Sequence, residues 1–124
     1  MELNIGRITI EGEALLSDFV NKMGLDGALV ASAEGLEMAS YFKSDLEADL
    51  IAADMASLLA STLSVLEDAK RGNMNEMIIS SDNGAIAIKD LGDDVVFGVL
   101  APSGYKMGSL TVSLKQFVKS LQEL

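Results

Sequence analysis

The sequence contains no cysteine and no histidine. Without cysteine it has neither a disulfide framework nor a thiolate nucleophile. Without histidine it lacks the usual general base of enzymes and the commonest transition-metal ligand. Carboxylate pairs such as Asp93-Asp94 lie in predicted turns and at helix ends, where solvated charges are far commoner than catalytic pairs. No phosphate-binding glycine loop is present. We therefore expect a protein that is not an enzyme and has no cofactor, no metal site and no catalytic residues.

Basic residues are also scarce. Nine lysines and arginines face 19 acidic residues, which gives a formal net charge of −10. Such a chain is repelled by nucleic acid and by anionic lipid surfaces, so we expect neither as a partner. Charged and polar residues interrupt the N-terminus, which argues against a signal peptide, and Asp54 interrupts the longest apolar segment, which argues against a membrane span. A cytoplasmic location is expected.

The chain of 124 residues has the length of one domain. We predict a single domain over residues 11–124 and an N-terminal extension over residues 1–10. With glycine counted and tyrosine left out, the apolar share exceeds the usual ~45–50%. A surplus of this kind typically lies in an interface with another chain. A core that is merely rich in alanine is the simpler alternative.

One long helix is predicted over residues 46–72, a segment with no proline, no aromatic residue and no glycine before its last position. Ser44 or Asp45 is the expected N-cap, and Gly72 the expected C-terminal cap. At about 100° per residue, the helix has one bulky face, expected to cover a sheet. That face consists of Ile51, Met55, Leu58, Leu59, Thr62, Val65 and Leu66.

Two narrower rows of side chains occupy the rest of the surface of this helix. The alanine strip is small enough for close approach by another helix, and it consists of Ala53, Ala56, Ala60 and Leu63. The polar stripe remains for solvent or a partner protein, and it consists of Asp54, Ser57, Ser61, Ser64 and Asp68. Because one helix on one sheet needs only the bulky face, this second apolar strip suggests contact with a second subunit.

The other segments alternate between strand and helix signals. Helices are expected over residues 11–23 and from Ser109, the expected N-cap, to near the C-terminus. Strands are expected over residues 26–32, 36–42, 74–81, 85–90 and 95–101. Residues 3–10, rich in β-branched side chains, are either an additional N-terminal edge strand or a mobile tail.

The predicted order is αββαβββα. Because short turns join most neighbouring strands, the five-stranded sheet should be mainly antiparallel. Strands that are apolar on both faces need helices on both sides, which makes the fold a three-layer α/β/α sandwich. We expect the long helix on one face and the other two helices on the opposite face. Met74 and Met77, on the strand after the long helix, suit either the core or a binding surface.

This order and four local sequences resemble the roadblock/LC7 family, the dynein light chain roadblock-like regulators of small GTPases. The sequences are DGALVASAEGLEMAS, the KRGN that ends the long helix, NEMIISSDNGAIAI and VVFGVLAPSGYKMGSL. The resemblance implies a homodimer, or a heterodimer with a paralogous roadblock-like chain, with the sheet continued through both subunits. The expected interface consists of the alanine strip and of Met74, Met77, Ile78 and Ile79.

The same resemblance implies a non-enzymatic scaffold or regulator that binds a Ras-like small GTPase across the paired long helices and acts as its GTPase-activating partner or holds it passively. The polar stripe is the expected contact surface. Two other functions remain open. The chain could be a small-molecule sensor, for which Thr62 and Tyr41 are the available polar groups, or a general protein-interaction domain.

Overall fold

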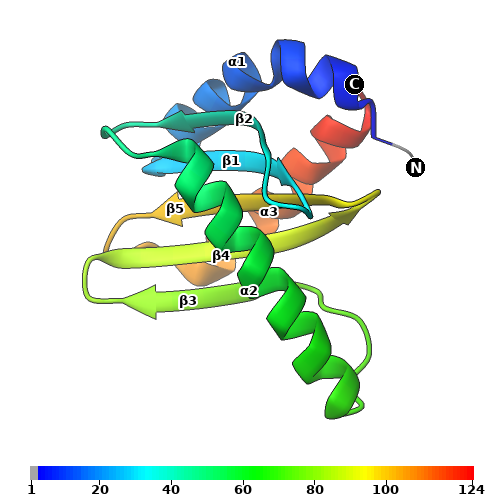
Figure 1. The fold of residues 1–124 in the computed structure, drawn as a ribbon. Coiled ribbons are helices and arrows are strands. Elements are labelled where there is room, and N and C mark those ends of the chain that lie inside the picture. Colours follow the sequence, from blue (N-terminus) through cyan, green and yellow to red (C-terminus); the bar gives the residue numbers. More distant parts are fainter. Residues whose placement is uncertain (1–2) are drawn as a thin grey trace.

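The computed structural model describes residues 3–124 (Figure 1). Three helices and five strands follow one another in the order αββαβββα, as the sequence predicts. Their bounds are α1 (Ile5–Met23), β1 (Gly27–Ser32), β2 (Glu37–Phe42), α2 (Ala48–Asp68), β3 (Met77–Ser81), β4 (Gly84–Gly92), β5 (Val95–Ala101) and α3 (Met107–Gln122).

The five strands form one antiparallel sheet in the order β2-β1-β5-β4-β3. Helices α1 and α3 cover one face and α2 crosses the other, which confirms the three-layer arrangement (Figure 1). Strands β1 and β5 lie in the middle of the sheet and are buried along nearly their whole length. This burial explains why their sequences are apolar without alternation.

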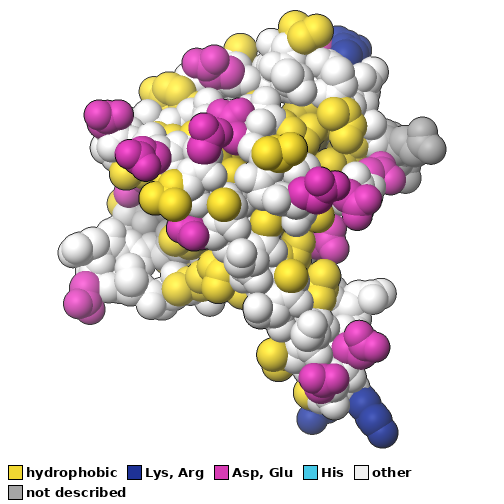
Figure 2. Space-filling view, in the orientation of Figure 1, with side chains coloured by type: hydrophobic (Ala, Val, Ile, Leu, Met, Phe, Trp, Pro, Cys, Tyr) yellow, Lys and Arg dark blue, Asp and Glu magenta, His cyan; other side chains and the backbone are white. Residues whose placement is uncertain are grey.

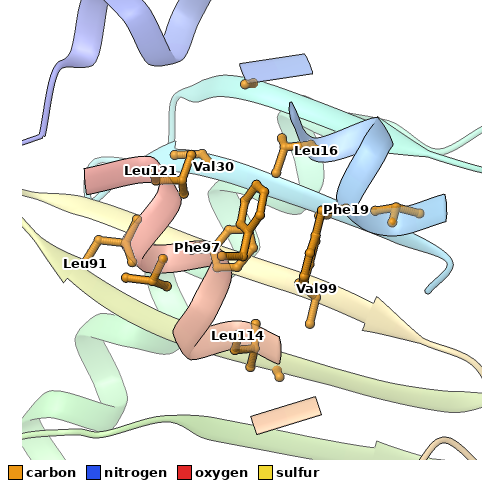
Figure 3. Close-up of a cluster of buried hydrophobic side chains, with 14 of the residues drawn as sticks. Leu16, Phe19, Val30, Leu91, Phe97, Val99, Leu114 and Leu121 are labelled. Carbon is orange, nitrogen blue, oxygen red and sulfur yellow. The ribbon is translucent and has the colours of Figure 1, made fainter. Parts of the chain in front are cut away.

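The larger core lies between the sheet and the pair α1 and α3 (Figure 3). At its centre, Phe97 of β5 and Phe19 of α1 both pack against Phe117 of α3. The ring centroids are 5.3 Å and 4.3 Å from that of Phe117. Offset aromatic stacking of this kind stabilises a core beyond the area that it buries. It fixes both helices on the same face of the sheet.

The predicted N-terminal strand is wrong, because residues 5–10 are the first turns of α1. Asn4 caps this helix by accepting the backbone N–H of Arg7 at 3.1 Å. The Arg7 side chain donates to Glu11 at 2.6 Å, which raises the pKa of Arg7 and lowers the pKa of Glu11. Buried positions then recur at helical spacing, at Ile8, Gly12, Leu16, Phe19 and Val20. This spacing and the cap outweigh the strand preference of the β-branched residues.

Helix α2 begins and ends inside the predicted range. Its N-cap is Glu47, with no side-chain cap, and not Ser44 or Asp45. Its C-cap is Ala69, and the left-handed residue that follows the cap is Lys70, with a φ of 56°, and not Gly72. The N–H groups of Lys70 and Arg71 donate to the carbonyls of Glu67 and Leu66, as in a Schellman motif. The helix therefore ends at Asp68, and the chain turns back immediately.

Two other predicted boundaries are also wrong. The N-cap of helix α3 is Lys106, three residues before the expected cap Ser109, and the helix begins at Met107. Strand β3 begins at Met77, so Met74 lies in the loop before it and packs against the α2 side of the sheet. Through the loop over residues 72–76, the chain returns from the end of α2 to the sheet.

Candidate functional site

The face of α2 that packs on the sheet differs from the predicted bulky face. Its buried residues are Ala52, Met55, Ala56 and Leu59, whereas Leu58 and Val65 are exposed. The helix can lie close to the sheet because β5 carries Gly98 beneath Met55, where any Cβ would collide with the Met55 thioether. The small side chains of Ala52 and Ala56 therefore face the sheet, and the bulky Leu58 and Val65 do not.

The alanine strip is partly used within the chain itself. Ala56 is buried, and a Cβ on Gly35 in the turn between β1 and β2 would lie 3.1 Å from the Cα of Ala53. The strip is therefore not free along its whole length for another helix. Ala60 and Leu63 remain exposed.

The second half of α2 extends past β3, the last strand of the sheet (Figure 1). Between residues 60 and 83, a segment that includes this half of α2 and all of β3, no residue is buried. The segment nevertheless carries large apolar side chains, among them Val65, which is 64% exposed, and Ile78, which is 40% exposed. Apolar side chains left uncovered on adjacent elements are typical of an interface.

Strand β3 is also an open sheet edge, because among residues 3–124 it pairs only with β4. An edge strand presents backbone N–H and C=O groups that can pair with a strand of another chain. Met77, Ile78 and Ile79, predicted as interface residues, all lie on this strand. The open edge and the overhanging half of α2 thus adjoin each other.

All five residues of the polar stripe are exposed on α2. Beside them lies an open groove, and its lining residues are Asp54, Ser57, Leu58, Ser61 and Ile86. Ile86 pairs across the sheet with Ile79 on one side and Leu100 on the other, so these three side chains share the face of the sheet that carries α2. All three are only partly buried, and apolar atoms are visible beside α2 in Figure 2. Ile86 and Leu100 were not predicted as site residues, because nothing in a single strand indicates which part of a sheet a helix leaves bare.

By length and composition alone, α2 could cross a membrane. This is weak support for a span, because a helix that packs on a sheet satisfies the same criterion. Its buried row lies against β1, β4 and β5, and Asp54 stands exposed near its middle. This packing indicates that α2 forms one layer of a folded domain.

A family model of the roadblock/LC7 domain matches residues 11–101. The chain belongs to the roadblock/LC7 family. Among solved structures, a roadblock/LC7 domain from Streptomyces avermitilis has a TM-score of 0.81 at 20% identity, over 90% of this chain and 94% of that one. MglB from Myxococcus xanthus has a TM-score of 0.82 at 12% identity, over 90% and 91%. An MglB in a tetrameric arrangement has a TM-score of 0.81 at 14% identity, over 99% and 91%.

At these identities the solved structures establish a shared fold. The comparison with curated proteins found no match. In this roadblock/LC7 chain, the polar groups considered for a sensor site do not converge. Thr62 donates to the Met77 sulfur on the α2 side of the sheet, whereas Tyr41 packs against the core on the opposite side. The site that the structure supports is therefore the surface formed by α2, its groove and the β3 edge.

Proposed function

We propose that this roadblock/LC7 chain is a non-enzymatic, dimeric scaffold or regulator that binds a Ras-like small GTPase across paired α2 helices. Two subunits join through antiparallel pairing of their β3 edges, so that the sheet continues from one into the other. In this arrangement, the overhanging half of each α2 covers the bare end of the other subunit's sheet. The second subunit is a copy of this chain or a paralogous roadblock-like chain, and the complex acts in the cytoplasm.

The observation that carries the proposal is the lack of any buried residue between positions 60 and 83. An amphipathic helix of 21 residues that lies on a sheet would ordinarily bury one face along its whole length. Here only its first half does so. A second subunit would bury the other half and pair the open β3 edge in a single step, which accounts for both features together.

The polar stripe supports the GTPase part of the proposal. In a pair of such helices, the residues opposite the buried face point away from both sheets and form one continuous surface. Ser57, Ser61 and Ser64 make that surface flat and hydrated, with Asp54 and Asp68 as its charges. Such a surface suits a protein partner that contacts both subunits, and the family resemblance indicates a Ras-like GTPase.

Copurification with the tagged chain from its source cells tests this function. The lysate is supplemented either with a GTP analogue or with GDP. We expect a small GTPase to be retained and its retention to depend on the nucleotide. Hydrolysis by the recovered GTPase, measured with and without the chain, separates an activating role from passive binding. Recovery of other proteins but no GTPase would instead favour a general interaction domain.

A further inference from the structure

Two leucines are uncovered near the first half of α2. Leu36 follows the turn between β1 and β2 and is 67% exposed, and Leu50 lies in the first turn of α2 and is 57% exposed. A Cβ on Gly35 would lie 3.1 Å from the Cα of Ala53, so the turn rests directly on the helix. Ala53 is itself exposed and lies one turn after Leu50, about 60° away around the helix. Leu36, Ala53 and Leu50 therefore form one apolar surface, the leucine patch.

The backbone of the turn holds Leu36 in a fixed position. The N–H of Leu36 donates to the Ser32 hydroxyl at 3.1 Å, and its carbonyl accepts the N–H of Ser32 at 2.8 Å. The N–H of Ala33 donates to the carbonyl of Asp94 at 2.7 Å, which ties this turn to the turn between β4 and β5. A side chain on a backbone that is already ordered loses less conformational entropy when a partner binds. Leu36 is therefore suited to anchor a partner.

Acidic side chains border the leucine patch. Three of them are exposed, Glu34 in the turn and Asp49 and Asp54 on α2. The sequence has no basic residue between positions 23 and 69 except Lys43, which follows the opposite end of β2. On the face drawn in Figure 2, acidic side chains surround the first half of α2, and the basic ones lie at the far top and bottom of the view. The patch is therefore the apolar centre of a negatively charged surface.

The leucine patch lies away from the edge at which the proposed dimer forms. Leu36 belongs to the turn between β1 and β2, and β2 is at the opposite edge of the sheet from β3. A second subunit paired along β3 leaves this turn and the helix beside it uncovered. Asp54 and Ser57 of the polar stripe follow Leu50 and Ala53 by four residues each, so the patch extends the polar stripe toward the turn.

We propose that the small GTPase also docks on the leucine patch, and that it presents there apolar side chains bordered by lysine or arginine. The inference rests on the proposed function and specifies the chemistry of the partner's surface. Burial of apolar side chains on both proteins drives the association. Opposite charges around that centre accelerate the encounter, and they exclude proteins with an acidic surface because like charges would then meet.

Substitution of the two leucines tests the apolar part. The GTPase recovered with the wild-type chain is titrated against purified wild type, the leucine variant and a control. The leucine variant carries Leu36→Gln and Leu50→Gln, and the control carries Ile10→Gln and Val112→Gln, at positions 84% and 57% exposed on α1 and α3. Circular dichroism and sedimentation should show both variants folded and self-associated as the wild type is. The leucine variant should bind the GTPase at least about tenfold more weakly, and the control should bind it as the wild type does.

Removal of two acidic side chains tests the charge. Raising the salt concentration from about 0.1 M to about 1 M shortens the screening length from about 10 Å to about 3 Å. Wild-type binding should therefore weaken with salt. Glu34→Gln with Asp54→Asn should weaken binding at low salt and reduce this dependence. Glu13→Gln with Asp18→Asn, two exposed acidic positions on α1, should keep the dependence of the wild type.

The outcomes separate this inference from the function on which it rests. If the leucine variant binds the GTPase as tightly as the wild type, the patch has no role and the proposed function stands. If binding by the wild type is insensitive to salt or strengthens with it, the partner's surface is not basic and the inference is wrong. If the wild type retains no small GTPase, the proposed function fails and the inference fails with it.

Discussion

Gly12 of α1 and Ala39 of β2 are in contact so close that a Cβ on Gly12 would lie 2.6 Å from that of Ala39. Real Cβ atoms do not approach so closely, so Gly12→Ala must push α1 away from the sheet. Because α1 also holds Phe19 in the aromatic core, we expect a loss of about 1–3 kcal/mol in the free energy of unfolding. Urea denaturation followed by circular dichroism measures it.

Gly6 is the matched control in the same helix. A Cβ there meets nothing closer than the Asn4 side chain, at 3.8 Å. Alanine is the better helix former, so Gly6→Ala, in the first turn of α1, should raise the free energy of unfolding by up to about 0.5 kcal/mol. Two substitutions of the same kind in one helix thus have opposite signs. Equal effects at both positions would mean that α1 does not pack against β2 in this way.

A second prediction concerns the turn between β4 and β5. Asp93 and Asp94 have φ angles of 53° and 59°, as in a type I′ turn, where glycine is preferred. Asp94→Gly should therefore stabilise the chain by about 0.5–1 kcal/mol, and thermal unfolding would show it as a higher midpoint. Asp93→Gly should gain less, because the Asp93 carboxylate accepts the N–H of Leu3 at 3.0 Å. A larger gain at Asp93 than at Asp94 would contradict this assignment.

Local signals explain which parts of the fold were predictable. The turns at Gly35 and at Asn83-Gly84 depend on a few neighbouring residues, and the strands beside them lie close to their predicted positions. Strand β5 has the predicted bounds at both ends. Its apolar run stops at Pro102, which fixes the C-terminal bound. Residues 3–10 misled the prediction because their β-branched residues are also compatible with a helix once Ile8 is buried.

The sequence of α2 alone could not predict which of its faces packs on the sheet. More than half of its circumference is apolar, so periodicity alone cannot select the arc that faces the sheet. The choice depends on glycines elsewhere in the chain: Gly98 under Met55 and Gly35 beside Ala53. Only the assembled sheet reveals that Leu58 and Val65 point outward and that Ala56 is buried.

Val65→Asp tests whether the overhanging half of α2 is an interface. Val65 is 64% exposed, so the substitution should leave the subunit folded. In the proposed dimer it places a charge against apolar surface, and the dissociation constant measured by sedimentation should rise at least about tenfold. Val112→Asp on α3, at a position 57% exposed, is the matched control and should have no effect on self-association. Equal behaviour of the two variants would remove α2 from the interface.

Ser64→Arg separates binding of the GTPase from dimer formation. Ser64 belongs to the polar stripe, is exposed, and does not line the groove beside α2. A long charged side chain there should obstruct a protein lying across the paired helices and weaken its binding about tenfold or more, while sedimentation shows the dimer unchanged. Ser120→Arg, an exposed serine on α3, introduces the same side chain on the opposite layer and should bind as the wild type does. If only Ser120→Arg weakened binding, the GTPase would lie on the side of α1 and α3, and the polar stripe would have no role in holding it.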